Sequence, residues 1–145
     1  MKITILEPAD GDEDEIIIRC RHMDQKLLKL IYALKSGQDR ITALRDGQFY
    51  QVAPRDIYYF EAVDNKVFLY LEQEVYETKL KLYELEEQFQ GSDFFRASKS
   101  CIVNLAKVRS VSPAFNGRFE ALMKNGERVM ISRQYVPFLK EKLGL

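Results

Sequence analysis

Short apolar runs separated by tight-turn dipeptides constrain the fold of this 145-residue chain more than any other feature. Three such dipeptides stand out: Asp46-Gly47, Asn116-Gly117 and Asn125-Gly126. Asp-Gly and Asn-Gly supply the two positive φ angles of a type I′ turn, whose twist matches that of paired antiparallel strands. We therefore expect residues 41–45 and 48–52 to form a hairpin. The other two dipeptides bracket residues 118–124 and should join three further strands.

The rest of the chain beyond residue 40 is also typical of β-structure with short helices. Further strands are predicted for residues 57–61, 66–71, 75–78, 101–103 and 108–111. Residues 57–61 and 66–71 flank Val63-Asp64-Asn65 and should form a second hairpin. Apolar residues at helical spacing predict two helices: Leu80, Leu82, Leu85 and Phe89 in one, and Tyr135, Val136, Leu139 and Leu143 in the other. The predicted fold class is mostly β with a few short helices (α+β).

Residues 1–40 have a different pattern. Residues 2–6 alternate apolar and polar side chains, and residues 16–18 are three isoleucines, so we expect two short strands around the acidic turn at residues 10–15. An amphipathic helix of about three turns should follow, with Asp24 as its N-cap and Gly37 as its stop. We expect a small strand–strand–helix extension at residues 1–40 and one domain at residues 41–145.

Composition limits the class of protein. Hydrophobic residues make up 46% of the chain, which is enough for a core. No apolar run approaches the roughly 18 residues of a membrane span. Glu7 comes too early for a secretory signal, and Cys20 and Cys101 form no C-x-x-C pair. We expect a cytoplasmic protein without a disulfide framework or a cysteine zinc site.

The chain carries few signals of catalysis. It has no glycine-rich nucleotide fingerprint, no Walker loop and no H-E-x-x-H motif, and His22 is its one histidine. Cys101 lies in an apolar run and should be a small core residue. The acidic run at residues 10–15 does not belong to a phosphorylated receiver domain, since a doubly wound receiver would need most of the chain. We expect neither an enzyme nor a cofactor.

The formal net charge is zero, but the charges are not evenly spread. Residues 1–90 carry a net charge of −6 and residues 91–145 carry +6. Local field, rather than total charge, steers a polyanion toward a protein. Within the basic part, Arg96, Ser98 and Lys99 follow an aromatic pair and precede a buried strand, so we expect them on an irregular, exposed segment. Such side chains suit phosphate and guanine contacts.

Four segments of the chain are informative together: Ile57-Tyr58-Tyr59-Phe60-Glu61-Ala62, Leu80-Lys81-Leu82-Tyr83-Glu84-Leu85-Glu86, Phe95-Arg96-Ala97-Ser98-Lys99-Ser100-Cys101-Ile102-Val103-Asn104 and Ile131-Ser132-Arg133-Gln134-Tyr135. In this order they resemble the LytTR family of bacterial DNA-binding transcriptional regulators. The resemblance covers about residues 42–145. It implies an elongated, strand-rich fold in which loops, rather than a recognition helix, enter successive major grooves. It also implies a stand-alone regulator, because residues 1–40 are too few for the receiver domain that usually accompanies this module.

The resemblance also implies which residues bind DNA. They lie in three segments: Asn65, Lys66 and Val67 in the loop of the second hairpin, Arg96, Ser98 and Lys99 before residue 101, and Arg133 at the start of the last helix. Lys66, Lys99 and Arg133 are the main candidates, one from each segment. Ser100 and Asn104 are expected to anchor the local backbone rather than to contact DNA.

The implied partner is double-stranded promoter DNA with paired direct repeats, read by two copies of the chain as a homodimer on DNA. A small inhibitory membrane protein is a further partner implied by the resemblance alone. The alternative hypothesis is a protein-interaction module whose basic end meets an acidic or membrane-protein partner. A ligand-binding or enzyme domain that uses the aromatic hairpins is a third. The helix of the extension could dock on the membrane partner, on a second copy or on its own β-domain, and we favour the last.

Overall fold

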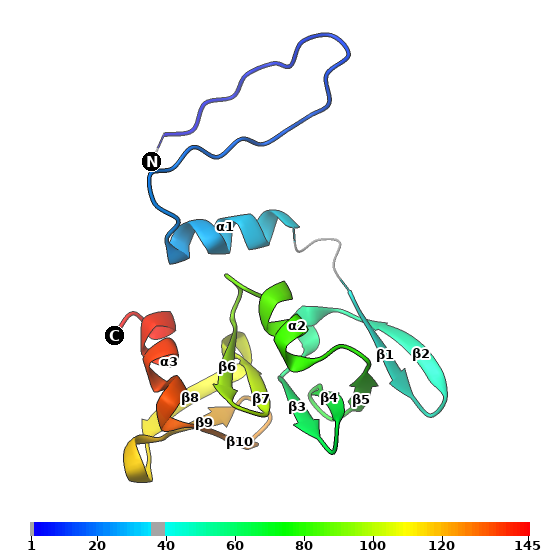
Figure 1. Ribbon diagram of the computed structural model, residues 1–145, viewed down its shortest axis with the longest axis vertical. Helices are drawn as coiled ribbons and strands as arrows, with labels where there is room; N and C mark the ends of the chain where they lie inside the picture. Colours follow the sequence, from blue (N-terminus) through cyan, green and yellow to red (C-terminus); the bar gives the residue numbers. More distant parts are fainter. Residues whose placement is uncertain (1, 36–39) are drawn as a thin grey trace.

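The computed structural model describes residues 2–35 and 40–145, which form two antiparallel sheets and three α-helices (Figure 1). The seven-stranded sheet has the order β2-β1-β5-β4-β3-β7-β6, and the three-stranded sheet has the order β10-β9-β8. The predicted fold class, mostly β with a few short helices, is confirmed.

The bounds of the elements are as follows. The larger sheet contains β1 (Ile41–Arg45), β2 (Gln48–Val52), β3 (Tyr59–Val63), β4 (Lys66–Tyr70), β5 (Val75–Thr78), β6 (Phe94–Ser98) and β7 (Cys101–Asn104). The smaller sheet contains β8 (Val108–Pro113), β9 (Phe119–Met123) and β10 (Arg128–Ile131). The α-helices are α1 (Gln25–Lys35), α2 (Leu82–Gln88) and α3 (Val136–Leu143), and short 3₁₀ turns are η1 (Pro54–Asp56), η2 (Leu105–Lys107), η3 (Phe115–Gly117) and η4 (Arg133–Tyr135).

The predicted hairpins are present. In the β1–β2 turn, Asp46 has φ 50° and Gly47 has φ 76°, which are the two positive angles of a type I′ turn. The β3–β4 hairpin uses the same device, with Asp64 at φ 50° and Asn65 at φ 63°. Asp and Asn tolerate this left-handed region better than other residues with a side chain. The turn is therefore two residues long, and Val63 pairs with Lys66 at the end of the strands.

Two apolar clusters hold the domain together. The first packs the larger sheet against α2, and its fully buried members include Phe60, Leu69 and Leu85. The second packs β6 and β7 against the smaller sheet and α3, with Ala121, Ile131 and Leu139 fully buried. Strands β6 and β7 contribute to the second cluster from one face, while Phe94 and Ile102 contribute to the first. The turn that joins these two strands is therefore fixed by both cores.

Helix α1 lies against its own β-rich domain. Asp24 caps it as expected, because its Oδ1 accepts a hydrogen bond of 2.8 Å from the backbone N–H of Leu27. The Tyr32 ring lies 6.4 Å, centroid to centroid, from the Phe89 ring at the end of α2. Gln25 Nε2 donates to Glu141 Oε1 of α3 over 3.3 Å. The predicted stop at Gly37 lies outside the described residues, and the domain boundary at residue 40 stays a prediction.

The two strands expected in the extension are wrong. Residues 2–24 contain no strand, and they loop away from the rest of the molecule above α1 (Figure 1). Ile3 is 83% exposed and Ile17 is 67% exposed. Alternation and β-branching favour a strand only where a neighbour supplies ladder hydrogen bonds and covers one face. In the structure, nothing from residues 40–145 pairs with this segment.

Candidate nucleic-acid interface

Arg96 and Ser98 lie in strand β6 and not, as the sequence suggested, on an irregular exposed segment. Phe95 and Ala97 alternate with them and are buried on the side of the second cluster. Alternation of buried apolar residues with polar ones is typical of a strand. The basic and hydroxyl residues at the alternate positions made the segment resemble an irregular loop in the sequence. A register shift between Arg96 and Ser98 then leads into a turn at Lys99 and Ser100, whose side chains are exposed.

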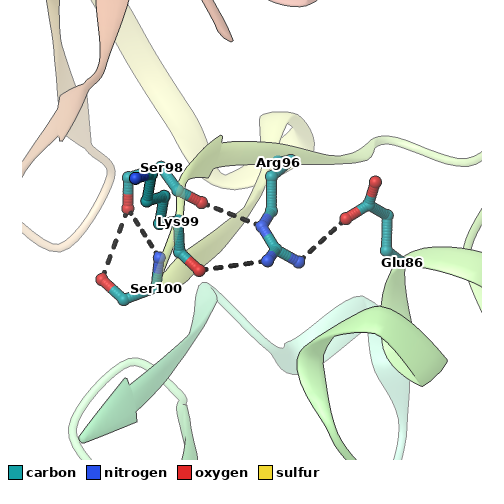
Figure 2. A network of polar contacts seen from close by, with 5 residues as sticks. All are labelled: Glu86, Arg96, Ser98, Lys99 and Ser100. Carbon is teal, nitrogen blue, oxygen red and sulfur yellow. Dashed lines mark hydrogen bonds and ion pairs between the residues drawn. The ribbon is translucent and has the colours of Figure 1, made fainter. Parts of the chain in front are cut away.

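The guanidinium of Arg96 holds this turn in place (Figure 2). Its Nε donates to the backbone carbonyl of Ser98 over 2.9 Å, and its Nη2 donates to that of Lys99 over 3.0 Å. Its Nη1 pairs with Glu86 Oε2 of α2 at 2.8 Å. The side chain is only 19% exposed. Arg96 therefore ties the turn to α2 and leaves the Lys99 side chain free to reach outward.

The second candidate segment is the β3–β4 turn. Asn65 and Lys66 are exposed at its tip. Val67, which was also expected in this loop, lies in β4 instead, where it is 6% exposed and belongs to the first cluster. Lys66 Nζ lies 3.9 Å from Glu77 Oε1 on β5. The Lys66 side chain is 63% exposed and that of Glu77 is 29% exposed. A solvent-accessible pair at this distance contributes little to stability, so Lys66 can exchange Glu77 for another anion at small cost.

The third candidate, Arg133, opens η4 and is exposed. Its aliphatic stem passes close to Gly117, where a Cβ would come within 2.8 Å of Arg133 Cδ. Arg133 lines a shallow hollow together with Ser98, Asn116 and Arg118. The exposed Arg118 was not singled out from the sequence. Arg118 could have been recognised as a candidate because it directly follows the Asn116-Gly117 turn within the basic part of the chain.

Backbone hydrogen bonds join the three segments. The N–H of Ala62 in β3 donates to the carbonyl of Ser100 over 2.8 Å, which links the β3–β4 hairpin to the β6–β7 turn. The N–H of Ser132 donates to the carbonyl of Ala97 over 2.8 Å, which links the start of η4 to β6. The β3–β4 turn and the β6–β7 turn both face the lower side of Figure 1, and Arg133 lines one hollow with Ser98 of β6. The structure thus brings the sequence-predicted residues onto one side of the molecule.

Asn104 and Ser100 act as local anchors, as expected. Asn104 is 2% exposed. Its Nδ2 donates to the carbonyl of Ile57 over 2.8 Å, and its Oδ1 accepts from the N–H of Ala106 over 3.1 Å. Besides the Ala62 contact, the backbone N–H of Ser100 donates to Ser98 Oγ over 3.3 Å. These bonds fix both ends of β7 and the turn that precedes it.

Comparison with known proteins assigns this arrangement to a family. A family model described as the LytTr DNA-binding domain matches residues 47–144. The chain belongs to the LytTR family. A solved LytTr DNA-binding domain of a response regulator from Bacillus cereus superposes with a TM-score of 0.71 at 28% identity, and covers 75% of this chain and 100% of that one. The prediction of a LytTR-type DNA-binding protein rather than an enzyme is therefore confirmed.

The relatives of this chain differ in length. The sensory transduction protein LytT of Enterococcus faecalis is 34% identical over 109 residues, which are 75% of this chain but 42% of that protein. The transcriptional regulatory protein YpdB of Escherichia coli K12 is 31% identical over 74% of this chain and 44% of its own length. The chain thus spans less than half of these relatives. A Staphylococcus aureus protein described as an uncharacterized HTH-type transcriptional regulator is 26% identical over 100% of this chain and 99% of its own length.

Other chemistry in this LytTR domain is limited. Burial raises the pKa of the Cys101 thiol to about 12, with the charge of Glu61 adding to the shift, so the thiol is neutral at pH 7 and is a core residue, as expected. Within residues 2–35 and 40–145, no group of three or more His, Cys, Asp or Glu side chains could hold a metal ion. In the same part of the chain, no helix is long and apolar enough to cross a membrane.

Proposed function

We propose that this chain is a sequence-specific transcriptional regulator that reads paired direct repeats in promoter DNA, with one LytTR domain on each repeat. The observation that carries the proposal is the linkage of three exposed turn segments by the Ala62–Ser100 and Ser132–Ala97 backbone hydrogen bonds. Since these bonds hold the segments in a fixed relation on one side, each can enter a groove without further ordering. Direct readout then comes from long cationic side chains.

Each candidate has a defined part in this proposal. Lys99 and Arg133 read base edges in the major groove, since Lys and Arg donate to guanine O6 and N7. Lys66 and Asn65 contact the flanking backbone, where a weakly held lysine exchanges Glu77 for a phosphate. Ser98 adds a hydroxyl beside Arg133.

Arg96 has two functions in the same proposal. Three of its five N–H donors are used on Ser98, Lys99 and Glu86, and the others stay available for a phosphate. Its main role is positioning: it fixes the direction in which the Lys99 side chain extends from the protein surface.

A protein that binds promoter DNA acts in the cytoplasm. Binding to two repeats brings two copies of the chain together as a homodimer on DNA.

Selection of binding sites from random duplexes tests the class of function. Enrichment of a repeated motif is expected. No enrichment would favour the alternative, a module that binds an acidic or membrane-protein partner through its basic end.

Affinity measured at several salt concentrations tests the assigned DNA face, which is the side of the molecule that carries Lys66, Lys99 and Arg133. Lys99→Ala and Arg133→Ala should each cost on the order of 1–3 kcal/mol if they read bases. A variant that loses one phosphate contact should reduce the slope of log affinity against log salt by roughly 0.9. Lys29→Ala is the matched control, because Lys29 is exposed on α1 at the opposite side of the molecule in Figure 1. The assigned face is wrong if Lys99→Ala and Arg133→Ala both behave like the control.

A further inference from the structure

The segment before α1 presents unpaired extended backbone and apolar side chains to solvent. Residues 2–24 are exposed throughout, and Ile16 and Ile17 are 70% and 67% exposed. They lie apart from both sheets (Figure 1). A stretch of free N–H and C=O groups beside β-branched side chains is a template for pairing with another strand. The side chains of the segment determine which strand can pair with it.

The segment at residues 12–22 is complementary to itself when two copies run antiparallel about Ile17. In this register Ile17 meets Ile17 of the second copy, and Ile16 meets Ile18. Glu15 meets Arg19, and Glu13 meets Arg21. The two-fold axis repeats each pair, so four opposite-charge pairs flank three apolar ones. Cross-strand pairs of both kinds stabilise antiparallel strands.

The register about Ile17 has more apolar pairs than either register shifted by one residue. A shift by one residue in one direction sets Ile16 opposite Arg19, and a shift in the other direction sets Glu15 opposite Ile18. The first shift keeps two isoleucine pairs (Ile17 with Ile18) and two Asp14–Arg21 pairs, and the second keeps two isoleucine pairs (Ile16 with Ile17) and four Asp–Arg pairs. Either shift thus loses one of the three apolar pairs and sets an isoleucine opposite a charged residue twice per dimer. Because side chains alternate between the faces of a strand, a one-residue slip also reverses which face each side chain occupies.

Pairing within one chain fits the sequence less well. The turn before this segment is closed by the N–H of Asp12, which donates to the carbonyl of Ala9 over 3.0 Å. A hairpin continued from that turn would set Ile5 opposite Ile16 and Ile3 opposite Ile18, but also Glu7 opposite Asp14 and Lys2 opposite Arg19. The last two are like-charge pairs, which destabilise a hairpin when they lie directly opposite. An isolated two-stranded hairpin is at best marginally stable in water even without them.

We propose that residues 12–22 pair antiparallel with the same segment of a second copy, so that the protein is a homodimer through its N-terminal segment without DNA. The occupant of this surface is a second copy because the charges and the apolar residues match across a two-fold axis. The paired segments connect two DNA-binding domains. This connection raises the effective concentration of the second domain near the DNA once the first has bound. The proposal concerns the free protein and stands whether or not the assigned DNA face is right.

Charge reversal tests the pairing by sedimentation of the full chain without DNA. Glu15→Arg sets two arginines opposite each other twice per dimer, and Arg19→Glu sets two acids opposite each other twice. Each should weaken dimerisation by roughly tenfold or more, since attraction becomes repulsion at two symmetric pairs. The double variant Glu15→Arg/Arg19→Glu restores opposite charges and should dimerise like the wild type. Lys29→Glu, on the exposed face of α1, is the control and should change nothing.

Mixing the two single variants adds a sharper test. A copy with two arginines fits a copy with two glutamates, so an equimolar mixture should form heterodimers although neither variant dimerises well alone. A monomeric wild type, single variants that dimerise normally, or a double variant and a mixture that stay monomeric would each overturn the proposal. DNA selection with the same variants reports separately on the proposed function, because neither residue belongs to the DNA face.

Discussion

Removal of the Arg96 side chain should loosen the turn that carries Lys99. Arg96→Ala deletes two hydrogen bonds to backbone carbonyls, at 2.9 and 3.0 Å, and an ion pair with Glu86 at 2.8 Å. The Arg96 side chain is 19% exposed, so solvent screens these interactions only in part. Glu86 is 54% exposed and can regain water when its partner is lost.

The magnitude follows from these exposures. A hydrogen bond from a charged donor contributes about 1.5–3 kcal/mol, but carbonyls in an open turn are rehydrated, so each contributes nearer about 1 kcal/mol here. The half-exposed ion pair adds at most about 1 kcal/mol. We therefore expect Arg96→Ala to lower the free energy of unfolding by about 2–3 kcal/mol.

Urea unfolding monitored by circular dichroism measures this loss, and Glu86→Gln separates its parts. Glu86→Gln removes only the ion pair and should cost at most about 1 kcal/mol. Arg96→Lys keeps the charge but lacks the planar fork, so it should fall between the two. Arg96 does not hold the turn through these bonds if Arg96→Ala costs under about 0.5 kcal/mol, below the expected sum, or if Glu86→Gln costs as much as Arg96→Ala. DNA affinity should fall with Arg96→Ala although Lys99 is intact.

Three further perturbations test other parts of the structure. Asn104→Ala leaves buried backbone groups without their partner and should cost about 2–3 kcal/mol in urea unfolding. Burial raises the pKa of the Cys101 thiol from 9.0 to about 12, so the unfolding free energy should fall as pH rises from 9.0 toward 12, and Cys101→Ala should remove that part of the pH dependence. Gly117→Ala adds a Cβ 2.8 Å from Arg133 Cδ at φ 72° and should weaken DNA binding more than Gly126→Ala, whose φ is 91° and whose Cβ meets nothing within 4 Å.

The hairpins could be predicted because their cause is local. Asp46-Gly47 specifies two positive φ angles by itself, and the flanking strands need only each other. The strands expected at residues 2–6 and 16–18 failed for the opposite reason. Their pattern is suitable, but ladder hydrogen bonds have to come from another strand, and within the described residues of one copy none offers them.

The candidate site was predictable in part. The residue types of Lys66, Lys99 and Arg133, together with the family resemblance, were enough to list them. The sequence did not show that backbone hydrogen bonds link the segments that carry these residues. Strand β3 pairs with β7 across some forty residues of chain, and Ser132 bonds to a carbonyl 35 positions earlier. The positioning role of Arg96 depends on Glu86 in α2, and long-range contacts of this kind leave no periodic trace in the sequence.

The neutral total charge is compatible with the proposed DNA binding. It also predicts that the protein selects DNA sequences through oriented base contacts rather than through overall charge. With Lys66 and Arg96 on phosphates, the slope of log affinity against log salt should be roughly −2 per domain, at about −0.9 for each phosphate neutralised. The acidic part of the chain weakens attraction to random DNA further. Selectivity then depends on how well each base contact is oriented. The bonds of Arg96 to the Lys99 turn, and of Ser132 to Ala97 beside Arg133, provide that orientation before DNA arrives. Variants that loosen these bonds should therefore lose affinity for the selected motif and keep their weak affinity for random duplexes, because non-specific binding depends on charge and not on orientation.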